Sequence, residues 1–211
     1  MKKTPSFFAL VTCLFVATQA SSQGWGPTPQ EEAKVVSVLG LAPGKVVGEI
    51  GAGDGHLSLV AARAVAPGGR VFATELGDSK RETLKRNAEA DPEVRNIEVV
   101  EARIKTTGLA ASCCDAVFMR DVYHHLTAPV EILADLRKVL RPQGLLLIID
   151  FEPRGSLPPV DGVPDDRRGH GIPIGVVVSE LKAAGFEIVT EDGAWRNDLY
   201  AVVARNPAAP K

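Results

Sequence analysis

The sequence predicts an α/β protein with a doubly wound, mostly parallel sheet of seven strands and an antiparallel edge strand at its C-terminal end. From residue 46 to residue 151, short apolar runs rich in Val and Ile alternate with helical patterns. Strands buried on both faces have few polar interruptions, and right-handed crossovers between them give a parallel sheet with helices on both sides. Two further runs near the end lie close together in sequence, which favours an antiparallel pair at the sheet edge.

The first predicted helix begins after a short polar stretch. Thr28 suits the N-cap, Pro29 the first helical position, and Glu31 is placed to close a capping box. We expect this helix to run to about Leu39.

The alternating region then supplies the body of the sheet, and the chain changes character after it. The helix before the fifth strand is expected to end in a turn at Arg141-Pro142-Gln143-Gly144. A later helix is closed by Gly185, and the link between the last two strands is predicted at residues 193–198. The predicted strands are residues 46–50, 70–75, 97–101, 115–120, 145–151, 186–191 and 199–204, and the predicted helices are residues 56–65, 79–90, 129–140 and 174–184.

Length and composition limit the possible protein classes. A chain of 211 residues has room for one domain with appendages. With 45% hydrophobic and 24% charged residues it has ordinary globular usage, which excludes a disordered chain. The formal net charge of -2 provides no positive field, so a nucleic-acid partner is not expected.

The first twenty residues have the pattern of a secretory signal peptide. Lys2 and Lys3 precede an uncharged apolar run at residues 7–17, and small residues follow up to Ala20, the predicted cleavage site. The run is shorter than the ~20 residues that span a bilayer. We therefore expect a secreted or periplasmic protein without a stable membrane span, with a tether through an uncleaved leader as the alternative. Lipidation at Cys13 is disfavoured because Cys13 lies inside the apolar run.

Beyond the leader, only Cys113 and Cys114 remain. Adjacent cysteines rarely bridge each other, so no disulfide framework is expected. They also lack a third ligand at a zinc spacing, and we interpret them as packing residues at a turn and a strand. The cysteine pattern therefore predicts no metal site.

A glycine-rich segment, Gly51-Ala52-Gly53-Asp54-Gly55, follows the first strand and leads into a helix. Such glycines allow a sharp turn and let a ligand lie against bare main chain. The spacing is GxGxG, whereas a dinucleotide fingerprint is GxGxxG. Glu75 ends the second strand, where a carboxylate can accept two hydrogen bonds from the ribose diol of an adenosyl or nicotinamide ligand.

With these motifs, the chain resembles the class I S-adenosylmethionine-dependent methyltransferases and their Rossmann-like fold. The likeness covers nearly all of residues 33–204: the loop EIGAGDG, the segment CCDAVFMRDVYHHL, the helix ILADLRKVLRPQG, the strand LLLIIDFEP and the tail SELKAAGF. The expected organisation is a signal peptide at 1–20, a polar segment and helix start at 21–32, a methyltransferase domain at 33–205 and a disordered tail at 206–211.

The resemblance implies a role for each matching position. The main chain of Gly51, Ala52 and Gly53 would pass the methionine part of S-adenosylmethionine, and Glu49 would face its ammonium group directly or through water. Glu75 would take the ribose hydroxyls. Further expected cofactor contacts are Leu76 on the adenine, Arg103 and Ile104 beside it, and the Arg120 carbonyl with Asp121 at the ammonium. Arg103 departs from the family pattern, because many relatives carry an acidic residue there and a guanidinium cannot accept the adenine amino hydrogen bond.

Histidines near the expected cleft are candidates for the chemistry. Of His124 and His125 after the fourth strand, one is expected to point into the cleft while its neighbour packs or faces solvent, and we select His124. The segment 153–173 is long for a connection, is expected to hang over the cleft, and holds His170 between glycines. His124 and His170 are candidate general bases, and Tyr123 and His124 candidate acceptor contacts. A purely structural role is the alternative for each.

The expected function is methyl transfer from S-adenosylmethionine to a small-molecule acceptor by in-line displacement. Two alternatives belong to other classes: a non-catalytic module that binds an adenosyl ligand, and a nicotinamide-dependent oxidoreductase, which needs the longer glycine spacing. The motifs leave the acceptor and the oligomeric state open.

Overall fold

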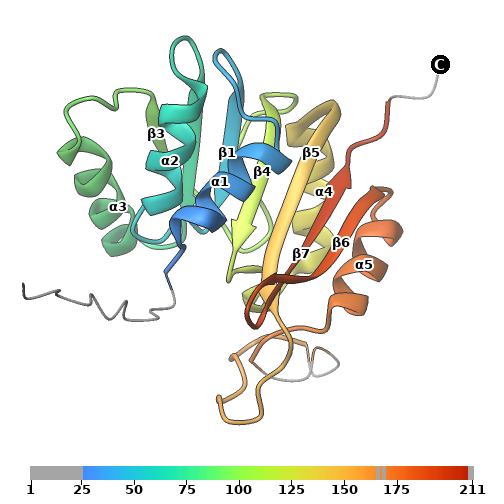
Figure 1. Cartoon of the computed structure of the whole chain (residues 1–211). Coiled ribbons are helices and arrows are strands. Elements are labelled where there is room, and N and C mark those ends of the chain that lie inside the picture. Colours follow the sequence, from blue (N-terminus) through green and yellow to red (C-terminus); the bar gives the residue numbers. More distant parts are fainter. Residues whose placement is uncertain (1–25, 165–166, 168–169, 209–211) are drawn as a thin grey trace, which may run out of the picture.

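The computed structural model describes residues 26–164, 167 and 170–208, and the predicted signal peptide lies outside them (Figure 1). Among the helices in these ranges, none is both long and apolar enough to cross a membrane.

The protein is built on a seven-stranded sheet of order β3-β2-β1-β4-β5-β7-β6. Strands β1 to β5 pair in parallel, and β7 pairs antiparallel with both β5 and β6. This confirms the predicted fold class, with β6 as the edge strand. The strands are β1 (Val46–Ile50), β2 (Arg70–Glu75), β3 (Ile97–Glu101), β4 (Cys114–Arg120), β5 (Leu140–Phe151), β6 (Glu187–Arg196) and β7 (Leu199–Arg205).

Helices cover both faces of the sheet (Figure 1). On one face α1 and α2 pack over residues such as Phe118 and Leu147, and on the other α4 and α5 pack over their chain neighbours Val117 and Leu146. This alternation is the period of a strand buried on both faces, which explains the continuous apolar runs. The helices are α1 (Pro29–Val38), α2 (His56–Val65), α3 (Asp78–Ala90), α4 (Pro129–Val139) and α5 (Ile174–Ala183), with a 3-10 turn η1 (Tyr123–His125).

The start of α1 confirms one part of its prediction and overturns another. The Thr28 hydroxyl accepts a hydrogen bond from the Glu31 amide at 3.3 Å, as expected of an N-cap. The capping box is wrong, because the Glu31 carboxylate turns into the protein, where it pairs with Arg120 and Arg196. Two partly buried guanidinium groups attract it more strongly than one backbone amide.

Strand β5 begins earlier than predicted. Residues 141–144, expected as a turn, belong to the strand, and its register against β4 shifts between Cys114 and Ala116. Gln143 adopts a left-handed φ of 67° in this irregular stretch. Asn206 stabilises it by donating to the main-chain carbonyls of residues 137, 140 and 141. Asn206 is therefore buried and fixed, although the sequence placed it in the tail.

Strand β6 also extends further than predicted, through most of the expected link. Trp195 lies buried against α1, with the Lys34 ammonium 4.7 Å from its ring centroid. Packing of this ring keeps the chain extended up to Arg196, and only residues 197–198 remain between the strands.

Candidate active site

A cavity of about 550 Å³ lies at the carboxyl ends of β1, β2 and β4, within the usual size range of small-molecule sites. Its lining includes Gly51 and Gly53 after β1, Glu75 at the end of β2 and Arg120 at the end of β4. Parallel strands bring their carboxyl ends to the same edge, so these distant residues meet there.

The glycine-rich loop presents main chain to this cavity. Gly51 has φ 69°, and a β-carbon there would lie 2.6 Å from a methyl carbon of Val122. Gly53 has φ 57° and no atom within 4 Å of its would-be β-carbon, so open space remains beside it. Ala52, in contrast, is buried and donates its amide to the Thr74 carbonyl at 2.9 Å. The loop thus offers bare backbone at Gly51 and Gly53, while Ala52 packs inward.

Glu75 connects the two predicted halves of the site. Its Oε2 accepts a hydrogen bond from the Gly53 amide and its Oε1 accepts one from the Leu76 amide, both at 2.9 Å. Each carboxylate oxygen keeps lone pairs for further donors. The bare main chain at Gly53 and the carboxylate at the end of β2 therefore share one cavity, as predicted from the sequence.

Apolar side chains line the cavity beyond Glu75. Leu76 and Ile104 are exposed large hydrophobic residues that contribute to its wall. Arg103 also lines the cavity, and its backbone exchanges hydrogen bonds with Thr106 at 2.9 and 3.3 Å. Exposed apolar surface in a concave site favours a flat, apolar ligand group there.

Asp121 supplies negative charge at the opposite wall. It adopts a left-handed φ of 55°, and its amide donates to the Ile149 carbonyl. One carboxylate oxygen pairs with Arg120, whereas Oδ1 is buried without a hydrogen-bond partner among the described residues. Burial raises the pKa of Asp121 above its usual range, against the opposing charge of Arg120. An unsatisfied acceptor beside a cavity suits a cationic ligand group.

Residues 48–148 match the family model described as a methyltransferase domain. The match covers the glycine loop, Glu75 and Asp121. This match, just under half of the chain, is to a methyltransferase domain. Together with the methyltransferase relatives it supports the class I S-adenosylmethionine-dependent family, whose cofactor is S-adenosylmethionine.

Proteins of similar sequence or fold include known methyltransferases. The domain is 30% identical over 112 residues to a 2-phytyl-1,4-naphtoquinone methyltransferase from Trichormus variabilis, covering 53% of this chain and 49% of that protein. It is 25% identical over 116 residues to the ubiquinone/menaquinone biosynthesis C-methyltransferase UbiE from Klebsiella pneumoniae, covering 55% and 46%. The chain spans about half the length of these curated relatives. A solved methyltransferase from Aquifex aeolicus shares the fold, with a TM-score of 0.69 at 24% identity over 85% of this chain and 93% of that one.

In this methyltransferase domain, Glu49 is not among the residues that line the cavity. Its carboxyl group is buried and accepts a hydrogen bond from the Ser58 hydroxyl of α2. Burial raises the pKa of Glu49 to about 8, and the charges of Asp54 and Glu75 act in the same direction. Glu49 is therefore protonated over much of the neutral range.

Glu49 should make the stability of the domain depend on pH. Between its ordinary pKa of 4.5 and about 8, the folded state holds a proton that the unfolded state has lost, so stability falls as pH rises through this window. We expect Glu49→Gln to remove this loss, on the order of 3 kcal/mol, because a neutral amide has no proton to lose. Chemical unfolding of both proteins at about pH 5 and about pH 8 measures the difference.

Glu98→Gln is the matched control, since Glu98 lies exposed on β3. This variant should retain the wild-type pH dependence. Parallel stability curves for the wild type and Glu49→Gln would contradict the assignment.

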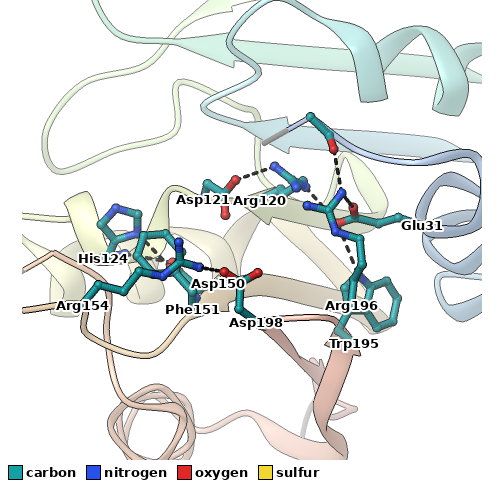
Figure 2. Close-up of polar contacts among 11 residues, drawn as sticks. Glu31, Arg120, Asp121, His124, Asp150, Phe151, Arg154, Trp195, Arg196 and Asp198 are labelled. Carbon is teal, nitrogen blue, oxygen red and sulfur yellow. Dashed lines mark hydrogen bonds and ion pairs between the residues drawn. The ribbon is translucent and has the colours of Figure 1, made fainter. Parts of the chain in front are cut away.

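The histidines occupy positions different from those predicted. His125 lines the cavity, and burial together with the charges of His124 and His170 lowers its pKa to about 4. His124 lies behind it, 1% exposed, with Nδ1 2.8 Å from an Asp150 oxygen (Figure 2). Tyr123 is in the core, where its hydroxyl donates to Glu180 at 2.6 Å. Burial raises the pKa of that hydroxyl further. The residue of the pair that reaches the cavity is therefore His125.

The long segment between β5 and α5 approaches the site from one side. None of its described residues lines the cavity, but the His170 ring lies with its centroid 5.0 Å from that of His124. Arg167, which sequence reasoning did not single out, anchors the segment: it is 2% exposed, pairs with Glu180 at 2.7 Å and donates to the Tyr123 carbonyl. A buried arginine is rare unless paired, but its partner carboxylate is not visible in sequence.

Proposed function

We propose that the domain binds S-adenosylmethionine in the 550 Å³ cavity and transfers its methyl group to a small organic acceptor. The observation that carries this proposal is Glu75, which holds the open main chain at Gly53 while keeping lone pairs free at the cavity. The unsatisfied Oδ1 of Asp121 supports it from the opposite wall.

Each wall suits one part of the cofactor. Glu75 would accept the ribose hydroxyls, and Leu76 with Ile104 would flank the adenine. Asp121 and the Arg120 carbonyl would hold the ammonium group, and Gly51 and Gly53 would border the methionine chain. Arg103 would contact the adenine through its stem and main chain; its guanidinium can donate to a ring nitrogen but cannot accept the hydrogen bond of the adenine amino group. When bound, the sulfonium supplies an activated methyl group, so the protein's own task is alignment and exclusion of water.

The acceptor is proposed as a small, partly apolar molecule. The names of two relatives state that they methylate or help to make quinones, and the cavity of this chain has an apolar wall. His125 lies at the border of the same cavity and, being uncharged at neutral pH, can accept a hydrogen bond from the acceptor molecule.

Ligand binding and label transfer together test the proposal. We expect S-adenosylhomocysteine to raise the melting temperature of the purified protein and NADH to leave it unchanged. Incubation with cofactor labelled in its methyl group and a panel of quinols, phenols, amines and thiols, followed by mass spectrometry, should show label on one acceptor class.

The outcomes separate the candidate functions. Binding without label transfer to any acceptor would indicate an adenosyl-ligand-binding module, and stabilisation by NADH alone would indicate an oxidoreductase. We also propose export by residues 1–20, for which the mass of the protein recovered from a bacterial periplasm is the check.

A further inference from the structure

Three of the four histidines of the chain meet beside the cavity. They come from two segments: His124 and His125 from η1, and His170 from the segment before α5. One ring nitrogen of each lies within 4.8 Å of the others. His170 is distant in sequence from the other two, so this group forms only through the fold.

The most buried of the three has a free nitrogen and a fixed orientation. Asp150, itself fully buried, accepts hydrogen bonds from the His124 amide at 3.1 Å and from the Phe151 amide at 2.9 Å. With these donors in place, it holds Nδ1 of His124 at 2.8 Å. The opposite nitrogen, Nε2, is buried and has no hydrogen-bond partner among the residues that the structure describes. A carboxylate behind one ring nitrogen and a lone pair on the other is the arrangement of metal-bound histidines.

The other two rings are held less tightly. His125 borders the cavity, and His170 has Nδ1 3.2 Å from the Pro158 carbonyl, which leaves its Nε2 for another partner. Arg167, three residues before His170, fixes this segment to η1 through the Tyr123 carbonyl. The chain therefore holds His170 near the pair without locking its ring.

We propose that His124, His125 and His170 form a binding site for a divalent transition metal of the zinc class, with Asp150 orienting His124. Imidazole nitrogens favour zinc and its neighbours over magnesium or calcium. Tetrahedral zinc with bonds of about 2.0–2.1 Å brings its nitrogens to about 3.4 Å, so small rotations of His125 and His170 complete the site. Three protein ligands leave one position open, beside a cavity that His125 lines.

Metal binding tests this site without reference to methyl transfer. The full chain, purified without a polyhistidine tag and treated with chelator, is titrated with Zn²⁺ by calorimetry and with Co²⁺ by visible absorption. We expect about one metal ion per chain and the visible bands of tetrahedral Co²⁺. His170→Ala should weaken Zn²⁺ binding at least about 100-fold, because only two imidazoles remain.

His56→Ala is the matched control, since His56 is the remaining histidine and pairs with Glu32 away from the group. It should bind Zn²⁺ as the wild type does.

Asp150→Asn should weaken binding about 10–100-fold while all three ligands remain. His125→Ala is a second ligand variant, at an exposed position, should His170→Ala misfold. The rings also contact one another and Phe151. If the three rings are only a packed aromatic group, the protein will take up no metal, or His170→Ala and His56→Ala will bind Zn²⁺ with equal affinity. Either result would overturn the proposal.

Discussion

Replacing Glu31 by alanine is expected to lower the free energy of unfolding by about 3–5 kcal/mol. Arg120, Arg196 and Trp195 gather around the Glu31 carboxylate (Figure 2), with distances of 2.8, 3.0 and 3.3 Å to its oxygens. The carboxylate is 2% exposed. Its removal leaves positive charge in a poorly hydrated place, and Asp121 offsets it only at Arg120.

Urea unfolding measures this loss of stability in Glu31→Ala, with Glu32→Ala as the control variant. Glu32 lies in the same first turn of α1, so both variants lose the same favourable interaction with the helix dipole. The Glu32 carboxylate pairs with the half-exposed His56, and its loss should cost less than about 1 kcal/mol. Equal destabilisation of the two variants would show that the buried ion pairs contribute little.

Glu75→Gln is expected to weaken S-adenosylhomocysteine binding about 100-fold, which corresponds to about 3 kcal/mol. An amide has one acceptor oxygen, so either the Gly53 or the Leu76 amide loses its partner. The ribose would also lose its charged acceptor, and hydrogen bonds to charged groups contribute about 1.5–3 kcal/mol each. Calorimetric titration of the wild type and the variant gives the ratio of dissociation constants.

The control is Glu101→Gln, one strand away. Glu101 pairs in register with Glu75 at the end of β3 but is exposed. Its substitution should leave the affinity within about twofold, because exposed charges are screened. Unchanged affinity in Glu75→Gln would remove the main support for the proposed cofactor position.

Sequence patterns located the regular elements well and the irregular ones poorly. The bounds of β1, β2, β3 and α2 agree with the prediction because apolar runs and glycines mark them locally. The start of β5 and the end of β6 depend on pairing with distant strands and on the Trp195 contact with α1. Such tertiary contacts decide the conformation where local propensity is weak.

The candidate site shows the same division. Gly51, Gly53 and Glu75 were identifiable because residues that end parallel strands meet at one edge. His124 packs inward because its amide and its ring both contact the buried Asp150, a long-range contact that no local motif marks. The ion pair between Glu31 and Arg120 joins residues 89 positions apart, so only the fold reveals it.

Strand β7 is the last in chain order, yet it occupies an interior position between β5 and β6. All seven residues from Leu199 to Arg205 pair with β5, and six of them are buried. A nascent chain can form hairpins and helices as it emerges, but its hydrophobic layers stay open on one side until residue 205 has left the ribosome. The interior place of β7 therefore delays closure of the sheet until this strand is available to pair with β5.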